Sequence, residues 1–394
     1  MPREPTRELL ARHARAFEAA FGAGTPPRTW FSPGRVNLMG AHLDYNGGPV
    51  MPTAIDRGTF FAVRPRSDRR VRLASTLEAR GRELDLDGPP FDRRGEWADY
   101  PAGVIEGLRR SAPRAKGLDI LFGGNLPVGA GLSSSASICV GTACVLDVLW
   151  ELGSSPLERV HAALRAEREF VGVRCGIMDP YAVGMARAGN LLWLDCKDAS
   201  IEHLPLDPAR LSIAVADTGV RRELAQGSFN ERVAEAQAAL RSLQRFAPDA
   251  TCLRDITVEL LDANRTSLGP VERRRAEHVV HEVARTFAAR GALERGDLPA
   301  FGAQMFAAHA SLRDLYEVSC VELDVLVDAA RDASGVFGAR LTGAGFGGCV
   351  VMLIDSRHTA TTVEHVAQRF AARFGRRPPI EIFGGDPGPR EIRA

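Results

Sequence analysis

The first part of the chain alternates between helical and strand-like hydrophobic patterns. In residues 7–22 apolar side chains recur at helical spacing, and Gly22 ends the pattern. Residues 49–66 are rich in β-branched and aromatic side chains, which favours strands. Residues 117–152 read as a strand, a glycine-rich turn and a long apolar helix, and a second helix is expected over residues 156–172. A strand, a small-residue loop and a helix N-terminus in this order can bind phosphate.

The second part of the chain begins after a polar stretch. Residues 211–219 are typical of a buried strand, and the polar residues 197–210 before them carry the expected domain boundary. We therefore expect an N-terminal domain over residues 1–204 and a C-terminal domain over residues 205–394. The second half continues with amphipathic helices and closes with a glycine-rich loop that runs into a strand. Helices and strands mix throughout, which predicts an α+β two-domain enzyme.

Composition and charge narrow the class of protein. The chain has 394 residues, is 45% hydrophobic and has a formal net charge of +1, so no global field would attract nucleic acid or an anionic membrane. No apolar run approaches the roughly 18 residues of a membrane span. The 7 cysteines are scattered without a CxxC pair, which indicates a reducing compartment and no metal cage. We expect a cytoplasmic protein, a monomer, that binds neither nucleic acid nor membrane.

Two glycine-rich loops are candidates for phosphate or close backbone contacts. In "LPVGAGLSSSAS", Gly129 and Gly131 allow close approach of an anion, and serines follow where a helix has free N–H groups. The loop lacks the GK[ST] of a Walker motif, and a serine-capped helix after a tight turn remains the alternative. The second loop, "GAGFGG" at residues 343–348, matches GxGxxG but leads into a strand, which excludes a dinucleotide fold. It must approach either a ligand or the other glycine loop.

Polar residues gather in three further places. The stretch "GRVNLMGAHLDYNGG" contains Arg35, His42 and Asp44, and "CGIMDP" contains Asp179. Glu167 lies within the expected helix over residues 156–172, which precedes Asp179 in the chain. A lone aspartate in a turn usually forms a cap. Together, however, these groups match the needs of phosphoryl transfer: a phosphate cradle, oxygen ligands for Mg²⁺, a cation for transition-state charge, and a carboxylate for the attacking hydroxyl.

The three motifs in this order resemble the signatures of the GHMP kinases, most closely the galactokinases. They are "GRVNLMGAHLDYNGG", "LPVGAGLSSSAS" and "LTGAGFGGC", and flanking stretches such as "AEREFVGVRCGIMD" and "HASLRDLYEVSCVELD" are similar too. The resemblance covers nearly the whole chain. It implies an N-terminal domain like ribosomal protein S5, a ferredoxin-like C-terminal domain, and an active site between them.

The resemblance also implies roles for individual residues. Asp179 would be the catalytic base on the anomeric hydroxyl of a sugar, and Arg35 would lower its pKa and stabilise charge during transfer. ATP and Mg²⁺ would be required. The Mg²⁺ ligands would be Ser135 and Glu167. The ATP-binding residues would be Trp97, Gly129, Ala130, Gly131, Leu132, Ser133, Ser134 and Ser135. The sugar-binding residues would be Arg35, Ala41, His42, Asp44, Gly176, Asp179 and Phe229, supported by Gly343, Gly345 and Gly347 of the second loop.

Three positions depart from the usual galactokinase pattern. Ala41 stands where a glutamate normally accepts a hydrogen bond from the C6 hydroxyl, and Phe229 stands where a tyrosine is usual. Pro180 replaces a glutamine and is expected to bias Asp179 away from helical geometry. Ala41 leaves a C6 hydroxyl unpaired at a cost of roughly 1 to 3 kcal/mol. It also removes the repulsion that a C6 carboxylate would meet.

These observations predict an ATP-dependent kinase for the anomeric hydroxyl of galactose or of a galactose-configured sugar altered at C6. The same GAH pattern occurs in galacturonokinases, so galacturonate is one alternative. A non-catalytic sugar sensor of the same family is another. The sensor is disfavoured because Ser135, Ala136 and Asp179 are all present. A mevalonate or heptose-phosphate kinase is disfavoured by "HLDYNGG".

Overall fold

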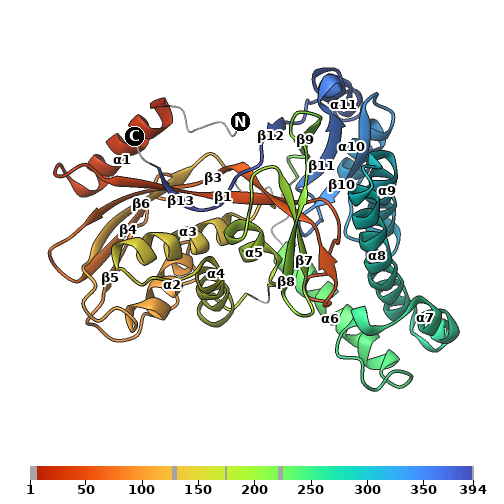
Figure 1. Ribbon diagram of the computed structural model, residues 1–394, viewed down its shortest axis with the longest axis horizontal. Helices are drawn as coiled ribbons and strands as arrows, with labels where there is room; N and C mark the ends of the chain where they lie inside the picture. The colour runs from red at the N-terminus through yellow and green to blue at the C-terminus, as the bar shows by residue number, and fades with distance from the viewer. Residues whose placement is uncertain (1–6, 127–130, 174, 221–224, 393–394) are drawn as a thin grey trace.

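A six-stranded sheet occupies one end of the molecule, with strand order β13-β1-β3-β6-β4-β5 (Figure 1). The structure is a computed structural model that describes residues 7–126, 131–173, 175–220 and 225–392. Neighbouring strands pair antiparallel, except that β4 pairs parallel with β6. The strands are β1 (Arg28–Asn37), β3 (Pro52–Pro65), β4 (Arg70–Ser75), β5 (Arg82–Asp85), β6 (Leu118–Gly124) and β13 (Arg390–Ile392).

Helices cover both faces of this sheet. α1 (Arg7–Phe21) lies against β6 and β3 on one face, where residues 7–22 are predicted to be helical. On the other face α3, which follows the first glycine-rich loop, packs against β1 and β3, with α2, α4 and α5 beside it (Figure 1). These helices are α2 (Asp99–Arg109), α3 (Ser134–Leu149), α4 (Pro156–Arg165) and α5 (Met178–Gly184).

The helix expected over residues 156–172 is divided in two. α4 begins with a capping box and a proline in its first turn, and it ends at Arg165. Over Ala166–Val171 the backbone winds as a π-helix, which Gly172 ends with a φ of 79°. Apolar spacing does not distinguish an α-turn from a π-turn, so the sequence pattern missed the change. Such π-turns are frequent at functional sites, and this one carries Glu167.

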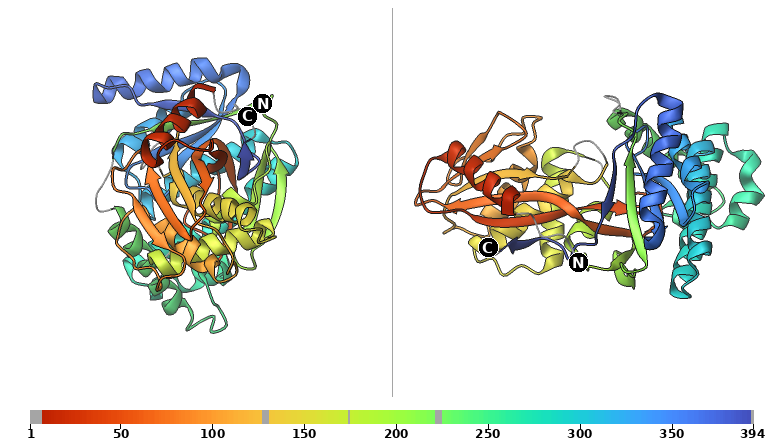
Figure 2. Two further views of the ribbon diagram at one scale, coloured as in Figure 1. Left: turned by 90° about the vertical axis from the view of Figure 1, so that its left-hand side faces the viewer. Right: turned by 90° about the horizontal axis from the view of Figure 1, so that it is seen from above.

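The second half of the chain forms an antiparallel sheet with strand order β10-β11-β9-β12, covered by helices. This sheet and α8 to α11 lie at the end of the molecule away from α1 (Figure 2). β11 is almost wholly buried because β10 and β9 flank it. The elements are β9 (Leu211–Asp217), α6 (Ala225–Leu243), α7 (Val258–Asn264), α8 (Pro270–Glu294), α9 (Leu298–Asp314), α10 (Val321–Arg331), β10 (Val336–Thr342), β11 (Cys349–Asp355), α11 (Thr359–Phe374) and β12 (Ile380–Phe383), with 3₁₀ turns at Leu253–Asp255, Arg265–Ser267 and Ser356–His358.

A third, small sheet lies between these parts. Its strand order is β2-β7-β8, with β2 (Pro49–Val50), β7 (Asn190–Asp195) and β8 (Ser200–Pro205). β8 ends beside the expected boundary at residues 204 and 205, and that boundary stays a prediction. β13, near the C-terminus, nevertheless returns to the first sheet and pairs with β1, so the second half contributes one strand to the first.

The loop after β1 is buried where the two halves of the chain meet. Leu43 belongs to the same hydrophobic cluster as Val279 and Val280 of α8. A side chain at Gly48 would press on Leu43 at 2.9 Å and on Val283 of α8 at 3.1 Å. The polar residues of the first motif are therefore held by contacts from both halves.

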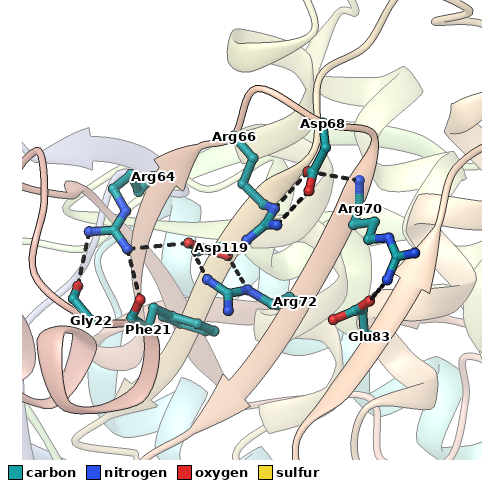
Figure 3. A network of polar contacts seen from close by, with 9 residues as sticks. All are labelled: Phe21, Gly22, Arg64, Arg66, Asp68, Arg70, Arg72, Glu83 and Asp119. Atoms are coloured by element: carbon teal, nitrogen blue, oxygen red, sulfur yellow. Dashed lines mark hydrogen bonds and ion pairs between the residues drawn. The ribbon is translucent and has the colours of Figure 1, made fainter.

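An arginine cluster around Asp119 fastens α1 to the sheet (Figure 3). Asp119 on β6 accepts from Arg72 Nε at 2.7 Å and Nη2 at 2.9 Å, and from Arg66 Nη1 at 2.9 Å. Arg64 reaches the same carboxylate at 3.4 Å and donates to the carbonyl of Phe21 at the end of α1. Burial alone would raise the pKa of Asp119, but the hydrogen bonds from Arg72 and Arg66 outweigh it and lower the pKa.

Among the described residues, no helix has both the length and the apolar character needed to cross a bilayer.

Candidate active site

A cavity of about 770 Å³ lies between the first motif, α5, the π-helix and the second glycine loop. Ten of the residues proposed from sequence line it: Arg35, His42, Asp44, Trp97, Ser135, Glu167, Gly176, Asp179, Phe229 and Gly343. Seven others do not line it: Gly131, Leu132, Ser133, Ser134, Gly345, Gly347 and Ala41. Gly129 and Ala130 lie outside the described residues. The structure thus brings the charged candidates into one cavity.

Arg35 and Asp179 form a two-point ion pair at the centre of this cavity. Arg35, near the end of β1, donates from Nε to Asp179 Oδ1 at 2.8 Å and from Nη2 to Oδ2 at 2.7 Å. Its third nitrogen, Nη1, donates to the Gly131 carbonyl at 2.6 Å. The Ser133 hydroxyl also donates to Asp179 Oδ2. The guanidinium is buried, whereas 28% of the Asp179 side chain is exposed toward the cavity.

The expectation that Pro180 moves Asp179 out of helical geometry is wrong. Asp179 is the second residue of α5, and Pro180 is the third. A proline fits the first turn of a helix because the N–H that it lacks has no partner inside the helix there. The preference of a residue before proline for extended backbone is overridden, and the carboxylate meets Arg35.

The part of the first motif that follows β1 adopts an unusual backbone conformation. Gly40 has a φ of 83° and His42 a φ of 57°, a left-handed conformation that side chains other than glycine rarely adopt. The backbone carbonyl of His42 accepts from Asn46 Nδ2 at 2.8 Å. The imidazole Nδ1 of His42 lies 2.8 Å from the Tyr45 hydroxyl. The Tyr45 hydroxyl in turn lies 2.9 Å from that of Tyr316, which comes from the second half. Several contacts therefore hold the imidazole in place.

Asp44 and His42 face the cavity in protonation states set by burial. Burial and the nearby Asp179 raise the pKa of Asp44 to about 6, while Arg35 acts against the shift. Burial, with a smaller effect of His278 and Arg340, lowers the pKa of His42 to about 3, so the imidazole is neutral at physiological pH. Asp44 lies directly against Gly176, where any side chain would overlap the carboxylate. Gly176 is thus a spacer that leaves room for Asp44.

Phe229 of α6 lines the cavity beside His42 and Tyr45. Its ring centroid lies 5.9 Å from that of His42 and 5.5 Å from that of Tyr45, at the edge-on angle of 78° to Tyr45. The phenylalanine therefore packs on the motif through its ring and offers no hydroxyl to the cavity.

Glu167, on the π-helix, also lines the cavity, and its carboxylate lies near that of Asp179. Burial raises the pKa of Glu167 to about 7, and the nearby charge of Asp179 adds to the shift, while a hydrogen bond from Ser135 opposes it. The thiol of Cys175, which the sequence reasoning did not consider, lies 3.7 Å from Glu167 Oε2. A hydroxyl and a buried carboxylate are oxygen ligands of the kind that Mg²⁺ accepts, and a bound cation would relieve the burial of the charge.

The outer end of the cavity is built around Trp97. The indole donates from Nε1 to the Arg80 carbonyl at 3.0 Å. Residues 94–96 just before it are held by Asp99, which accepts from the Gly95 N–H at 2.6 Å. Arg82 donates to the same carboxylate at 2.7 Å, and both side chains are buried. Sequence reasoning missed this buried pair because its partners lie on different elements.

The two glycine loops meet. A Cβ on Gly131 would lie 3.5 Å from the Gly343 Cα, and a Cβ on Gly343 would lie 3.2 Å from the Gly131 carbonyl oxygen. Gly345, with a φ of 84°, has the Val318 carbonyl where a side chain would stand. Among the described residues, the second loop therefore approaches the first glycine loop, which was one of its two expected neighbours.

Comparison with known proteins identifies the family. The galactokinase galactose-binding signature matches residues 15–65, and the models of the GHMP kinases N terminal domain and GHMP kinases C terminal match residues 99–187 and 289–373. The galactokinases of Fusobacterium nucleatum and Bacillus subtilis are each 39% identical to this chain, over 93% and 96% of it and 95% and 97% of theirs. The chain belongs to the galactokinase family. The crystal structure of Lactococcus lactis galactokinase complexed with galactose matches this galactokinase-family chain with a TM-score of 0.91 at 34% identity, covering 98% of this chain and 100% of that one.

Membership in the galactokinase family confirms the predicted fold and the predicted class of enzyme. The chain has the two-domain α+β fold of the GHMP kinases and is an ATP-dependent sugar kinase. These matches favour the enzyme over the non-catalytic sensor.

Proposed function

We propose that the enzyme transfers the γ-phosphoryl group of ATP to the anomeric hydroxyl of galactose, with Asp179 and Arg35 at the reacting centre. The observation that carries the proposal is the two-point Arg35–Asp179 pair, which lies where the first motif, the first glycine loop and α5 meet. The relatives named above are galactokinases, and one was solved with galactose.

The geometry supports a division of work between the two residues. Asp179 receives two hydrogen bonds from Arg35 and one from Ser133, and its exposed edge keeps one lone pair for a sugar hydroxyl. That carboxylate can orient the hydroxyl and accept its proton as the new bond to phosphorus forms. Arg35 keeps the carboxylate in place, and its charge stabilises the negative charge that develops on the transferred group.

The wall beside Asp179 supports recognition of the remaining sugar hydroxyls. Asp44 is a hydrogen-bond acceptor above pH 6, and the neutral His42 can donate or accept. Gly176 and Phe229 leave the space and the apolar surface against which a sugar ring can lie. Ala41 does not line the cavity, so its effect on a C6 substituent would be indirect. The relatives do not favour galacturonate, and galactose is the substrate we propose.

ATP and Mg²⁺ fit the other wall. Ser135 and Glu167 would hold the metal ion, which would neutralise phosphate charge when bound. The start of α3 offers free backbone N–H groups to the phosphates, and Trp97 lines the cavity where an adenine ring could lie. Leu132, Ser133 and Ser134, with Gly129 and Ala130 of the same loop, stay in our proposal as its ATP-binding segment.

A coupled ADP-release assay over a panel of sugars tests the proposed function. We expect turnover on galactose at least about tenfold more efficient than on galacturonate, because the added carboxylate would enter a cavity that Asp44, Glu167 and Asp179 already line. Absence of turnover on galactose, arabinose, galactosamine and galacturonate would contradict the proposal. Ala41→Glu is expected to raise the preference for galactose over galacturonate, and an unchanged ratio would show that residue 41 does not act on C6.

Three further expectations stay as proposals. They are the domain boundary at residues 204 and 205, a monomeric state and a cytoplasmic location, the last resting on the scattered cysteines.

A further inference from the structure

Glu282 lies in the middle of α8, in the second half of the chain, and its carboxylate is fully buried. Oε1 accepts from the backbone N–H of Gly40 at 3.3 Å and from that of Ala41 at 3.2 Å. Oε2 accepts from Arg285 Nε at 2.8 Å. Burying a carboxylate is unfavourable unless it is paired and hydrogen-bonded. Here one carboxylate oxygen of Glu282 is bound to the backbone of a loop that lies 241 residues away in sequence.

Arg340 on β10 helps to compensate the charge of Glu282. Its Nη1 lies 3.9 Å from Glu282 Oε1 and makes no hydrogen bond to any described residue. Its Nε donates to the Leu341 carbonyl at 2.8 Å. Burial lowers the pKa of Arg340 to about 10, and Glu282 opposes the shift. The carboxylate thus has a cation on each side, and Oε1 is left to bind the two N–H groups.

The two N–H groups belong to the strained part of the first motif. Gly40 has a φ of 83° and His42 a φ of 57° on either side of Ala41. Successive N–H groups in such a turn point to one side and form a concave anion site. A non-glycine residue in the left-handed region is strained, and it persists there only where its surroundings impose it. Glu282 supplies the anion that this turn requires.

The carbonyl group of Ala41 is bound from the same helix. His278, one turn before Glu282, has Nε2 at 3.3 Å from the Ala41 oxygen. A carbonyl can only accept, so Nε2 carries the proton, and Nδ1 accepts from the Ser311 hydroxyl at 2.8 Å. The imidazole ring also stacks on Tyr316 at 4.4 Å between centroids. α8 therefore holds both polar backbone groups of Ala41.

We propose that Glu282 is a positioning residue for sugar recognition, which it achieves by fixing the backbone of Gly40 and Ala41 so that His42 and Asp44 face the sugar. The proposal rests on the galactose kinase function argued above. Glu282 does not line the cavity, and both of its oxygens are bound to protein groups. It therefore neither contacts the sugar nor replaces the carboxylate that Ala41 lacks.

The role predicts a selective kinetic effect. Without the carboxylate, the turn at Gly40 to His42 relaxes and sugar binding weakens, while Ser135 and Glu167 on the opposite wall keep their places. We expect Glu282→Ala to raise KM for galactose at least about thirtyfold and to change KM for ATP less than about threefold. Glu282→Gln should recover most of the loss, because the amide oxygen accepts the same two N–H groups.

Glu282→Asp and Glu277→Ala complete the experiment. Glu282→Asp keeps the charge but shortens the side chain by one methylene, and it is expected to raise KM for galactose as Glu282→Ala does. Glu277 lies on the same helix and pairs with surface arginines, so Glu277→Ala should leave both KM values unchanged. If Glu282→Ala does not fold, Glu282→Asp against Glu282→Gln decides the question.

The outcomes separate the inference from the function on which it rests. A wild-type enzyme without turnover on galactose contradicts the proposed function. An active wild type whose Glu282→Asp variant keeps KM for galactose within about threefold overturns the positioning role alone. Equal rises in both KM values, or no recovery in Glu282→Gln, would also overturn it, because a general loss of structure gives that pattern.

Discussion

Two arginine–aspartate pairs in this molecule have nearly the same geometry and opposite surroundings. Arg35 binds Asp179 through Nε and Nη2 at 2.8 and 2.7 Å, and Arg72 binds Asp119 through the same two nitrogens at 2.7 and 2.9 Å. Asp119 also receives Arg66 and Arg64 and is buried against α1 (Figure 3). Asp179 has a single arginine and an edge that faces the cavity.

The difference shows that the ion pair itself does not distinguish Asp179, which we propose as the catalytic carboxylate, from a structural carboxylate such as Asp119. A carboxylate has about four acceptor positions. Around Asp119 the arginines occupy them, so the group can only hold elements together. Around Asp179 two hydrogen bonds from Arg35 and one from Ser133 leave one acceptor position open to the cavity, so the group can bind and deprotonate a hydroxyl. The local contacts that leave an oxygen accessible therefore carry the functional meaning.

Asp179→Asn is the change that should separate the two pairs most. The amide keeps the volume but loses the basic oxygen, so kcat for galactose should fall about a thousandfold or more. The thermal midpoint should stay within a few degrees of wild type, because this pair is open to the cavity. A coupled ADP assay measures kcat, and calorimetric binding of galactose is the control for an intact site. A kcat within tenfold of wild type would contradict the role of Asp179.

Asp119→Ala should have the reverse profile. It leaves Arg64, Arg66 and Arg72 without their shared acceptor, and it should lower the free energy of unfolding by about 2 to 3 kcal/mol. The arginines reach solvent in part, so the loss is below that of a fully buried pair. Urea unfolding at pH 7 measures it. The kcat of the folded enzyme should be unchanged, and a large drop in kcat without a loss of stability would contradict the structural role.

The deficit of Asp119→Ala should also depend on pH. The arginines lower the pKa of Asp119 below its ordinary value, so its ion pairs stabilise the fold above about pH 4 and lose that effect as the carboxylate is protonated. The difference in unfolding free energy between wild type and variant should therefore shrink at pH values below 4.

Replacing each arginine by lysine sharpens the comparison. Lysine presents one ammonium group and cannot reproduce the two parallel hydrogen bonds. Arg35→Lys should reduce kcat by about ten- to a hundredfold, because Asp179 then loses its fixed orientation. Arg72→Lys should cost no more than about 1 kcal/mol of stability, because Arg66 and Arg64 still bind Asp119. Equal effects of the two substitutions on kcat would show that the pairs do not differ as proposed.

The sequence predicted the parts of this comparison that are encoded locally. Helical spacing in α1, the helix α3 that follows the first glycine-rich motif and the strand β11 after the second loop each depend on neighbouring residues, and the structure has all three elements. The kinase family was recognisable because its motifs are continuous stretches. The cavity gathers Arg35 and Asp179 from positions 144 residues apart, and their expected convergence rested on family resemblance.

What the sequence did not show depends on contacts between distant elements. The arginines around Asp119 come from β3, from the loop after it and from β4, and Glu282 acts on Gly40 from the other half of the chain, so neither pairing has a local signature. The π-turn at Glu167 has the same apolar spacing as an α-helix. Pro180 was misjudged because its usual effect on the preceding residue is overridden at a helix start.

Asp44 is a third carboxylate, and it tests how far the comparison extends. It faces the cavity like Asp179, but among the described residues no arginine binds it through two nitrogens. Burial and the charge of Asp179 raise its pKa to about 6, with Arg35 opposing. Ionised Asp44 accepts from sugar hydroxyls through both oxygens, whereas the protonated group presents an O–H on one of them, so we expect kcat/KM for galactose to level off above pH 6 and to fall below it.

Asp44→Asn identifies the group responsible for that profile. The variant should have lower kcat/KM at pH 8 and lose the inflection near pH 6. His42, with a pKa of about 3, stays neutral throughout, and the Mg²⁺ of the assay would keep Glu167, whose pKa burial raises to about 7, ionised. The fold disfavours ionised Asp44, so the stabilising effect of its protonated form is lost as pH rises through 6. Asp44→Asn should therefore unfold at a higher temperature than wild type at pH 8. An inflection that persists in the variant would assign the titration to another group and leave Asp44 without this role.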